Sequence, residues 1–365
     1  MPDIRFIKRP TLLVDPNIVS RNIENMKQRA RVAGASFRPH FKTHQSGVIG
    51  EWFREAGVQK ITVSSVQMAH YFASYGWKDI TIAFPFNIRE TEDLAQLQKL
   101  ADITILTASV ETIAYIENHL NKPVNVQIKI DSGAGRAGLS FQDTEVVRVL
   151  VDRLEKSSIL KFTGFLSHAG QTYQARGSDG IQQIADQSHR DFRQLINSIG
   201  KTECQVSWGD TPSCSKASMN GYFDEWRPGN FVFHDIMQYH LGSCNLDDIA
   251  AVVACPVVEV HKQQKRMIIY GGAVHFSKDF IEADAGFRLY GYLVNLTAGG
   301  WSRPVPGAWL SAVSQEHGIV TFSDEAVNNY RAGDLIGILP VHSCLTVSAL
   351  REIFTTDGQY CPVFS

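Results

Sequence analysis

Lys42 is the residue whose setting points most directly to chemistry. It lies in the segment RPHFKTH, residues 38–44, where a short apolar run ends between His40 and His44. A lysine that ends a buried strand cannot extend its ammonium group into water as surface lysines do. Bonding to an aldehyde removes that buried charge, and lysine is the side chain that forms such adducts with pyridoxal phosphate. The alternative is an exposed strand-end lysine between two polar histidines.

Two later segments, SWGDTPS (207–213) and RPGN (227–230), are rich in small and hydroxyl residues. Such residues expose backbone N–H groups, and the loops after the last two strands of a parallel barrel often hold a phosphate. Ordinary Gly/Pro turns are the alternative. The candidate cofactor contacts in these segments are Ser207, Gly209, Thr211, Ser213, Arg227, Gly229 and Asn230.

The segment DSGAGRAG, residues 131–138, contains a formal G-x-G-x-x-G pattern after an expected strand, which is the best argument for nicotinamide binding. The next helix is expected only after Ser140, too late to face a pyrophosphate. No acidic residue ends the following strand, where His168 stands instead of a ribose-binding carboxylate. A NAD(P)-dependent oxidoreductase is therefore a distant alternative.

His168 ends the run GFLSH, and Tyr173 follows shortly after it. An imidazole at this position can stack on a flat ring, although a hydrogen-bonded core histidine is the commoner case. We interpret both residues as cofactor contacts.

The triplet HSC, from His342 to Cys344, is a candidate metal motif. In an extended segment residues i and i+2 project to the same side, so the imidazole and thiolate would converge, and this pair suits zinc. Structural zinc sites need four protein ligands, so two would leave positions open for substrate and water. A buried cysteine beside a histidine is the alternative. His317, in the preceding hairpin, is a candidate for acid–base support.

From about residue 36 to 234, β-branched runs alternate with amphipathic stretches. Eight such units favour an α/β fold with a closed parallel (β/α)8 TIM-type barrel over an open doubly wound sheet. Barrel strands present functional groups at their C-terminal ends, which is where Lys42, Arg136 and His168 fall. The expected strands are 36–41, 60–64, 79–83, 102–106, 124–130, 161–166, 204–208 and 230–233.

After about residue 245 helical periodicity stops, and apolar runs punctuated by Gly and Pro predict a C-terminal all-β domain. The segment 11–15 precedes the barrel and is expected to pair with that domain. The predicted domains are 16–240 for the barrel, and 1–15 with 241–365 for the β domain.

The composition is that of an ordinary globular protein, with 365 residues, 44% of them hydrophobic, and a formal net charge of -2. This charge provides no basic surface for nucleic acid or an anionic membrane. The longest apolar run, 249–258, is too short to span a bilayer, and the first residues carry charges where a signal peptide is apolar. The cysteines are scattered without a CxxC pair, as expected of reduced thiols. We therefore expect a cytoplasmic protein.

Taken together, the sequence resembles the fold-type III pyridoxal phosphate enzymes of the D-serine dehydratase and D-threonine aldolase family, which combine an alanine racemase-like barrel with a C-terminal β domain. The resemblance runs nearly end to end through the motifs above. It implies that Lys42 forms the Schiff base, that Arg136 lies near the phenolic oxygen of the cofactor, and that the loops at 207–213 and 229–230 hold its phosphate. It also implies a homodimer and a divalent metal on His342 and Cys344, zinc with manganese as the alternative.

The candidate roles follow from the motifs and the resemblance. The catalytic candidates are Lys42, Tyr173 and His317, and the metal candidates are His342 and Cys344. The cofactor-binding candidates are Lys42, His40, Arg136, His168, Tyr173, Ser207, Gly209, Thr211, Ser213, Arg227, Gly229 and Asn230.

Three departures bear on the substrate. The aldolase branch typically carries His-x-Asp at the metal, whereas this sequence has the His-x-Cys of the dehydratase branch. Residues 271–273, GGA, replace the Asp-Ala-Gly of the family, and Gln45 stands where lysine is common. We predict dehydration of a β-hydroxy D-amino acid, D-serine or D-threo-3-hydroxyaspartate, to a 2-oxo acid and ammonia. Retro-aldol cleavage is the alternative, and an amino-acid racemase or a non-catalytic carrier of pyridoxal phosphate is more distant.

Overall fold

The computed structural model describes residues 7–175, 177–283 and 286–364, which form two compact units. The barrel unit comprises the described residues of 24–42 and 53–229, and the β unit comprises those of 1–23, 43–52 and 230–365. The domain limits expected from the sequence stay a prediction, and residues 1–6 of the segment 1–15 lie outside the described residues.

The barrel unit contains an eight-stranded parallel sheet in the order β2-β9-β8-β7-β6-β5-β4-β3. A parallel bridge between His40 and Thr62 brings the continuation of β2 beside β3 and so nearly closes the sheet. The predicted (β/α)8 barrel is confirmed. Its strands are β2 (Ser36–Phe37), β3 (Lys60–Val63), β4 (Asp79–Pro85), β5 (Asp102–Thr107), β6 (Val124–Lys129), β7 (Leu160–Ser167), β8 (Val206–Trp208) and β9 (Glu225–Trp226).

The eighth strand differs from the expectation. Residues 230–233 were predicted as a strand, but Asn230–Val232 forms a 3-10 turn, and the last strand is Glu225–Trp226. The sequence did not predict this strand because Asp224 and Glu225 are acidic, and acidic residues are uncommon in strands. Arg227 and Gly229 therefore follow the last barrel strand instead of preceding it.

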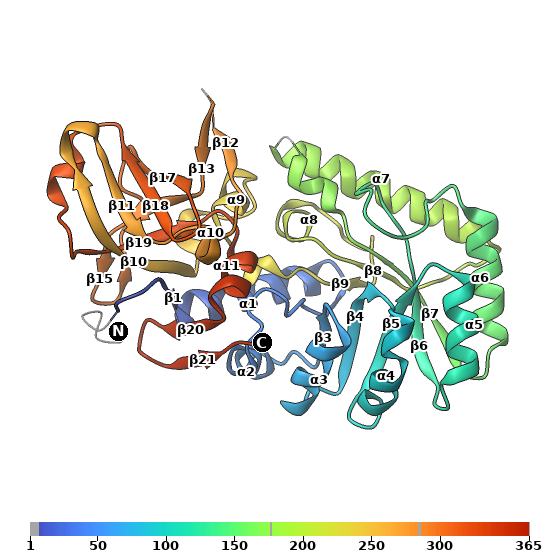
Figure 1. The fold of residues 1–365 in the computed structure, drawn as a ribbon. Helices are drawn as coiled ribbons and strands as arrows, with labels where there is room; N and C mark the ends of the chain where they lie inside the picture. Colours follow the sequence, from blue (N-terminus) through green and yellow to red (C-terminus); the bar gives the residue numbers. More distant parts are fainter. Residues whose placement is uncertain (1–6, 176, 284–285, 365) are drawn as a thin grey trace. The chain divides into compact units, whose positions relative to one another are not determined.

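The helices lie on the outer side of the barrel strands, as Figure 1 shows for α5, α6 and α7. Helix α6 illustrates the cause, because its buried residues Val147, Leu150, Val151 and Leu154 form one apolar stripe. The helices before and within the barrel are α1 (Pro16–Val32), α2 (Gly47–Glu55), α3 (Val66–Ser74), α4 (Thr91–Leu97), α5 (Val110–His119), α6 (Thr144–Lys156), α7 (Gly177–Ser198) and α8 (Thr211–Lys216).

Strand β6 has an unusual inner face. Asn125, Gln127 and Lys129 alternate with Val126 and Ile128, so the polar residues share one side of the strand. Gln127 and Lys129 are nonetheless buried. The polar side therefore faces the interior of the barrel, where a cluster of charged groups is described below.

The β unit is built on a nine-stranded sheet in the order β11-β18-β17-β14-β19-β10-β1-β20-β21. Strand β1 (Thr11–Val14) lies inside this sheet, antiparallel to β10 and parallel to β20, which confirms the pairing expected for segment 11–15. The other strands are β10 (Ala251–His261), β11 (Arg266–Tyr270), β14 (Gly291–Val294), β17 (Ala308–Val313), β18 (His317–Phe322), β19 (Leu335–Pro340), β20 (Glu352–Thr355) and β21 (Tyr360–Pro362).

Smaller elements complete the β unit. Two short hairpins pair β12 with β13 and β15 with β16. A buried core that includes Leu13, Val252 and Leu339 lies against the large sheet. The remaining elements are α9 (Ile236–His240), α10 (Ala273–Phe276), α11 (Ser343–Leu350), β12 (Ile281–Ala283), β13 (Phe287–Leu289), β15 (Leu296–Thr297) and β16 (Gly300–Trp301). No helix in the described ranges combines the length and the apolar character that a membrane crossing requires.

Candidate active site

Lys42 lies just after the segment that continues strand β2. His40 forms the bridge to Thr62 on β3, and Lys42 follows two residues later at the C-terminal end of the barrel strands. The backbone N–H of Lys42 donates a hydrogen bond to His40 Nδ1 at 3.3 Å. The lysine is half-buried, so its setting differs from that of an exposed strand-end residue.

Several cationic groups of the barrel unit interact around this lysine. Burial lowers the pKa of His40 well below its usual value, and the positive charges of Lys42 and Arg227 lower it further. His168 behaves in the same way, because burial and the charges of Lys42 and Arg136 lower its pKa. Both imidazoles are therefore neutral near pH 7.

The two neutral histidines present different ring nitrogens as donors. His168 Nδ1 lies 2.5 Å from the carbonyl oxygen of Gly209, so this nitrogen carries the proton. His40 Nδ1 accepts from the N–H of Lys42, so its proton is on Nε2. Tyr173 lies near His168, with a distance of 6.5 Å between ring centroids.

A second lysine, Lys129, belongs to the same cluster and was missed from the sequence. Burial and the charges of Arg227 and Arg136 lower its pKa to about 7. Lys129 and Arg227 are buried, Lys42 is half-buried and Arg136 is exposed, and the mutual repulsion of these cations would be relieved by an anion. Pyridoxal phosphate, with its phosphate and phenolate charges, matches this need, and Lys42 supplies the amine that its aldehyde requires.

The side chain of Asp131, the first residue of the glycine-rich turn at 131–138, binds the backbone of the same turn. The carboxylate of Asp131 accepts hydrogen bonds from the backbone N–H groups of Gly133, Ala134, Gly135 and Arg136. These groups therefore have partners within the turn and are not free to bind a pyrophosphate. Helix α6 begins only at Thr144, as the sequence indicated. The turn therefore brings Arg136 close to the cationic cluster of the barrel and is not a dinucleotide-binding loop.

The hydroxyl groups expected to bind phosphate already have protein partners. Ser213 Oγ donates to the carboxylate of Asp210 and accepts from Trp208 Nε1 at 2.9 Å. Ser207 Oγ lies between Glu225 and Arg227. Gly209 is required for space, because a Cβ there would lie 2.8 Å from the carbonyl oxygen of Arg227. The predicted phosphate contacts of these residues stay predictions.

In the β unit, His342 and Cys344 begin helix α11. The extended geometry expected from the sequence is wrong, since His342 is the N-cap residue and Cys344 lies in the first helical turn. The two side chains nevertheless converge and form a hydrogen bond. Although burial lowers the pKa of His342, the charge and hydrogen bond of Cys344, with contributions from Asp235 and Asp279, outweigh it and raise the pKa to about 10.

The neighbours of this pair suit a metal centre. His342 Nδ1 donates to Asp279 Oδ2 at 2.7 Å, which leaves Nε2 for a metal, as in carboxylate–histidine–zinc arrangements. Cys344 Sγ accepts from Asn230 Nδ2 at 3.6 Å and shares a hydrogen bond of 3.2 Å with Thr43 Oγ1, in which either atom can be the donor. Asn230 Oδ1 is buried and has no hydrogen-bond partner among the described residues.

Asp235 fixes these residues relative to one another. Its buried carboxylate accepts from Asn230 Nδ2 at 2.5 Å and from the backbone N–H of Ser343 at 3.0 Å. No group of three or more His, Cys, Asp or Glu side chains within the described ranges forms a metal cluster. A metal held by His342 and Cys344 would therefore keep open positions, as a catalytic metal does.

Among the described residues, no hydrogen bond or ion pair links His317 to His342 or Cys344. His317 lies on β18 opposite Tyr270 of β11, and its side chain is exposed. The neighbouring Glu316 lies 3.7 Å from His275 Nε2. A catalytic role of His317 stays a prediction, as does that of Tyr173.

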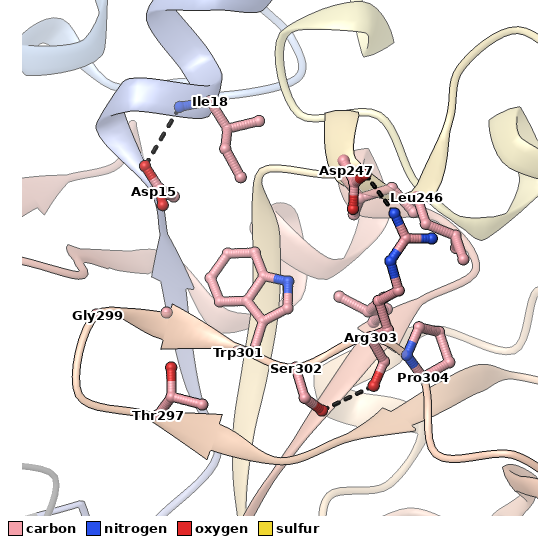
Figure 2. A pocket seen from close by; sticks show the side chains of 13 residues that line it. Asp15, Ile18, Leu246, Asp247, Thr297, Gly299, Trp301, Ser302, Arg303 and Pro304 are labelled. Atoms are coloured by element: carbon pink, nitrogen blue, oxygen red, sulfur yellow. Dashed lines mark hydrogen bonds and ion pairs between the residues drawn. The ribbon is translucent and has the colours of Figure 1, made fainter.

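The β unit also contains a cavity of ≈ 260 Å³ that holds none of the predicted site residues. Figure 2 shows Trp301 in its centre, with Asp15 and Asp247 on either side. Asp15 Oδ1 caps the first turn of α1, and Asp247 pairs with Arg303 at 2.5 Å in an exposed ion pair. Its polar groups thus have structural partners, and the cavity is separate from the chemistry described above.

Comparison with known proteins identifies the family of both parts of the chain. A family model of the alanine racemase N-terminal domain matches residues 14–236, and a serine dehydratase domain model matches residues 250–356. The chain belongs to the D-serine dehydratase and D-threonine aldolase family. A D-serine dehydratase from Dictyostelium discoideum is 28% identical over 98% of this chain and 96% of that protein.

Two further members are informative. D-threo-3-hydroxyaspartate dehydratase from Delftia sp. (strain HT23) is 29% identical over 92% of this chain and 91% of that protein. Its solved structure has a TM-score of 0.90 and covers 100% of this chain and 99% of that one, at 26% identity. A cysteine-to-alanine mutant of that enzyme was solved in a metal-free form. A 3-hydroxy-D-aspartate aldolase from Paracoccus denitrificans is 25% identical over 63% of this chain and 61% of that protein. The family is pyridoxal phosphate-dependent, and this member is a lyase.

Four residues of the site were not found from the sequence. For Lys129 a signal existed, because a strand with polar residues at alternate positions has a polar inner face when it belongs to a barrel. Glu225, Asp235 and Asp279 gave no signal, since isolated acidic residues are usually exposed.

Proposed function

We propose that this enzyme removes water from a β-hydroxy D-amino acid, D-serine or D-threo-3-hydroxyaspartate, and releases a 2-oxo acid and ammonia. When bound, pyridoxal phosphate supplies an electron sink for charge at Cα, and a divalent metal supplies a Lewis acid for the β-hydroxyl group. The observation that carries the proposal is the pairing of His342 with Cys344, backed by Asp279, in a chain that also has Lys42 in a cationic barrel cluster.

The chain's own groups have distinct tasks in this scheme. Lys42 Nζ removes the α-proton of the substrate, and the cluster around it balances anionic charge. His40 and His168, held neutral by their surroundings, add hydrogen-bonding rings without further positive charge. Thr43 directly follows Lys42 in the chain, and its hydroxyl contacts Cys344 Sγ. Cleavage of the Cβ–O bond gives dehydration, whereas removal of the β-hydroxyl proton gives retro-aldol cleavage.

The products from D-threonine separate these two reactions. Dehydration yields 2-oxobutanoate and ammonia, whereas aldol cleavage yields glycine and acetaldehyde. We expect 2-oxobutanoate as the main product, and L-threonine should react poorly. Glycine as the main product would move this enzyme to the aldolase branch. A racemase would instead interconvert D- and L-alanine, which chiral chromatography detects.

Finer properties are also proposed. We expect zinc at His342 and Cys344, because the imidazole, once it has released a proton on metal binding, forms a borderline-soft pair with the thiolate; manganese is the alternative. We further propose a cytoplasmic homodimer that binds neither nucleic acid nor membrane. Metal analysis of protein purified without added metals and light scattering on the purified protein test these points.

A further inference from the structure

We propose that Glu225, acting through the hydroxyl group of Ser207, is a positioning residue for Arg227. The inference rests on the proposed binding of pyridoxal phosphate, since Arg227 is a predicted cofactor contact. Ser207 then serves this positioning and is not itself a ligand of the phosphate.

The direction of each hydrogen bond in this group can be derived. Glu225 is 1% exposed and accepts from Arg38 Nε at 2.8 Å, with Lys60 Nζ at 3.3 Å. Although burial raises the pKa of Glu225, the charge of Arg38 and the hydrogen bond from Ser207 outweigh it and lower the pKa below its usual value. Glu225 is therefore ionised and only accepts hydrogen bonds. Ser207 Oγ, 2.6 Å from the Glu225 carboxylate, must donate its single proton to it.

This leaves the Ser207 oxygen free to accept, and Arg227 Nε donates to it at 2.7 Å. Arg227 Nη2 donates to the backbone oxygens of Ser167 and Ser207 at 2.6 and 3.2 Å. One edge of a planar, rigid guanidinium group is thereby fixed. Nη1 takes part in none of these hydrogen bonds, and the residue as a whole is only 4% exposed.

A buried guanidinium held along its Nε–Nη2 edge has a fixed orientation in which Nη1 can face a ligand. Loss of the Ser207 hydroxyl would free Nε and let the group rotate, so binding of the cofactor would have to reorder it. Such a loss of preorganisation weakens binding even when no direct contact is removed. Burial lowers the pKa of Arg227, and the negative charge of Glu225 opposes this effect. The carboxylate therefore also stabilises the charged form of Arg227.

The test compares Ser207→Ala and Glu225→Gln with the matched control Asp79→Asn. Asp79 accepts from Arg38 Nη1 at 2.5 Å, on the side of Arg38 away from Glu225, and its side chain is half-exposed. Each full-length variant is freed of cofactor and titrated with pyridoxal phosphate. The dissociation constant, the absorption spectrum as a function of pH, and the unfolding temperature of the cofactor-free protein are recorded.

We expect Ser207→Ala and Glu225→Gln to weaken pyridoxal phosphate binding by about tenfold, the effect of losing one hydrogen bond to a charged group. The pH at which the bound cofactor changes its absorption should also shift, and Asp79→Asn should match the wild type in both. Lower unfolding temperatures with unchanged affinity and unchanged pH profile would overturn the inference and leave a structural role. If Ser207→Ala does not fold, Glu225→Gln decides by the same measurements. A wild-type protein that binds no pyridoxal phosphate would overturn the proposed function as well.

Discussion

Substitution of Lys129 tests whether this buried lysine lowers the stability of the barrel and at the same time favours binding of an anion. The folded protein lowers the pKa of this lysine from 10.5 to about 7, chiefly through burial and then through Arg227 and Arg136. Between these two values the unfolded chain binds more protons than the folded one, so the free energy of unfolding rises with pH through this window. The shift counts against the folded state by roughly 4 kcal/mol near pH 7.5 and by about 1 kcal/mol near pH 9.5.

Lys129→Met removes this penalty but also loses the hydrogen bond from Nζ to the carbonyl oxygen of Ile130. We therefore expect the cofactor-free variant to be more stable than the wild type by about 2–4 kcal/mol near pH 7.5. Near pH 9.5 the lost hydrogen bond offsets the remaining penalty of about 1 kcal/mol, so the two proteins should be nearly equal in stability. Urea unfolding at both pH values measures this difference. Lys161→Met, at an exposed position on β7, is the matched control and should change stability little.

The effect on cofactor binding should have the opposite sign. A bound dianion raises the pKa of a nearby amine, so Lys129 takes up a proton when pyridoxal phosphate binds, and the methionine variant cannot. The variant should bind the cofactor several-fold more weakly while being more stable without it. A stability gain that is the same at both pH values, or no gain at all, would refute the description of Lys129 as a destabilising member of the cluster.

Three further predictions concern the cofactor and the metal. Lys42→Ala should lose the yellow chromophore that borohydride reduces, together with nearly all turnover; a variant that keeps both would exclude this lysine as the anchor. Arg136→Ala should weaken pyridoxal phosphate binding without lowering the unfolding temperature, as titration and thermal scans will show, because this side chain is exposed. Cys344→Ala should lose the metal found by elemental analysis but keep the yellow chromophore, and full metal content in the variant would contradict the assignment.

The repeating pattern of the chain was sufficient to predict the barrel. Helix α5, Val110–His119, lies between two of the expected strands; it begins where Ser109 Oγ accepts a hydrogen bond from the backbone N–H of Thr112. The position predicted for the eighth strand was wrong because its two residues, Glu225–Trp226, show no strand pattern in the sequence. Their conformation is imposed by pairing with β2 and β8, which is a long-range effect.

The residues of the candidate site that belong to a local sequence motif could be predicted. Those that join the site through long-range contacts could not. His342 and Cys344 were found from their spacing, yet the reason for their convergence was wrong, since the chain turns into α11 at that point. Asp279 and Asp235 come from distant segments, so no local pattern connects them to the triplet. Likewise, the role of Ser207 depends on a carboxylate 18 residues later in the chain.

The position of β1 has a consequence for how the chain folds during its synthesis. This strand leaves the ribosome long before its partners, because its antiparallel partner β10 starts at Ala251 and its parallel partner β20 starts at Glu352. The apolar segment Thr11–Val14 therefore stays unpaired until the barrel residues that separate it from β10 have been made. A fragment that begins after β1 would leave the edges of β10 and β20 open, and we expect it to aggregate.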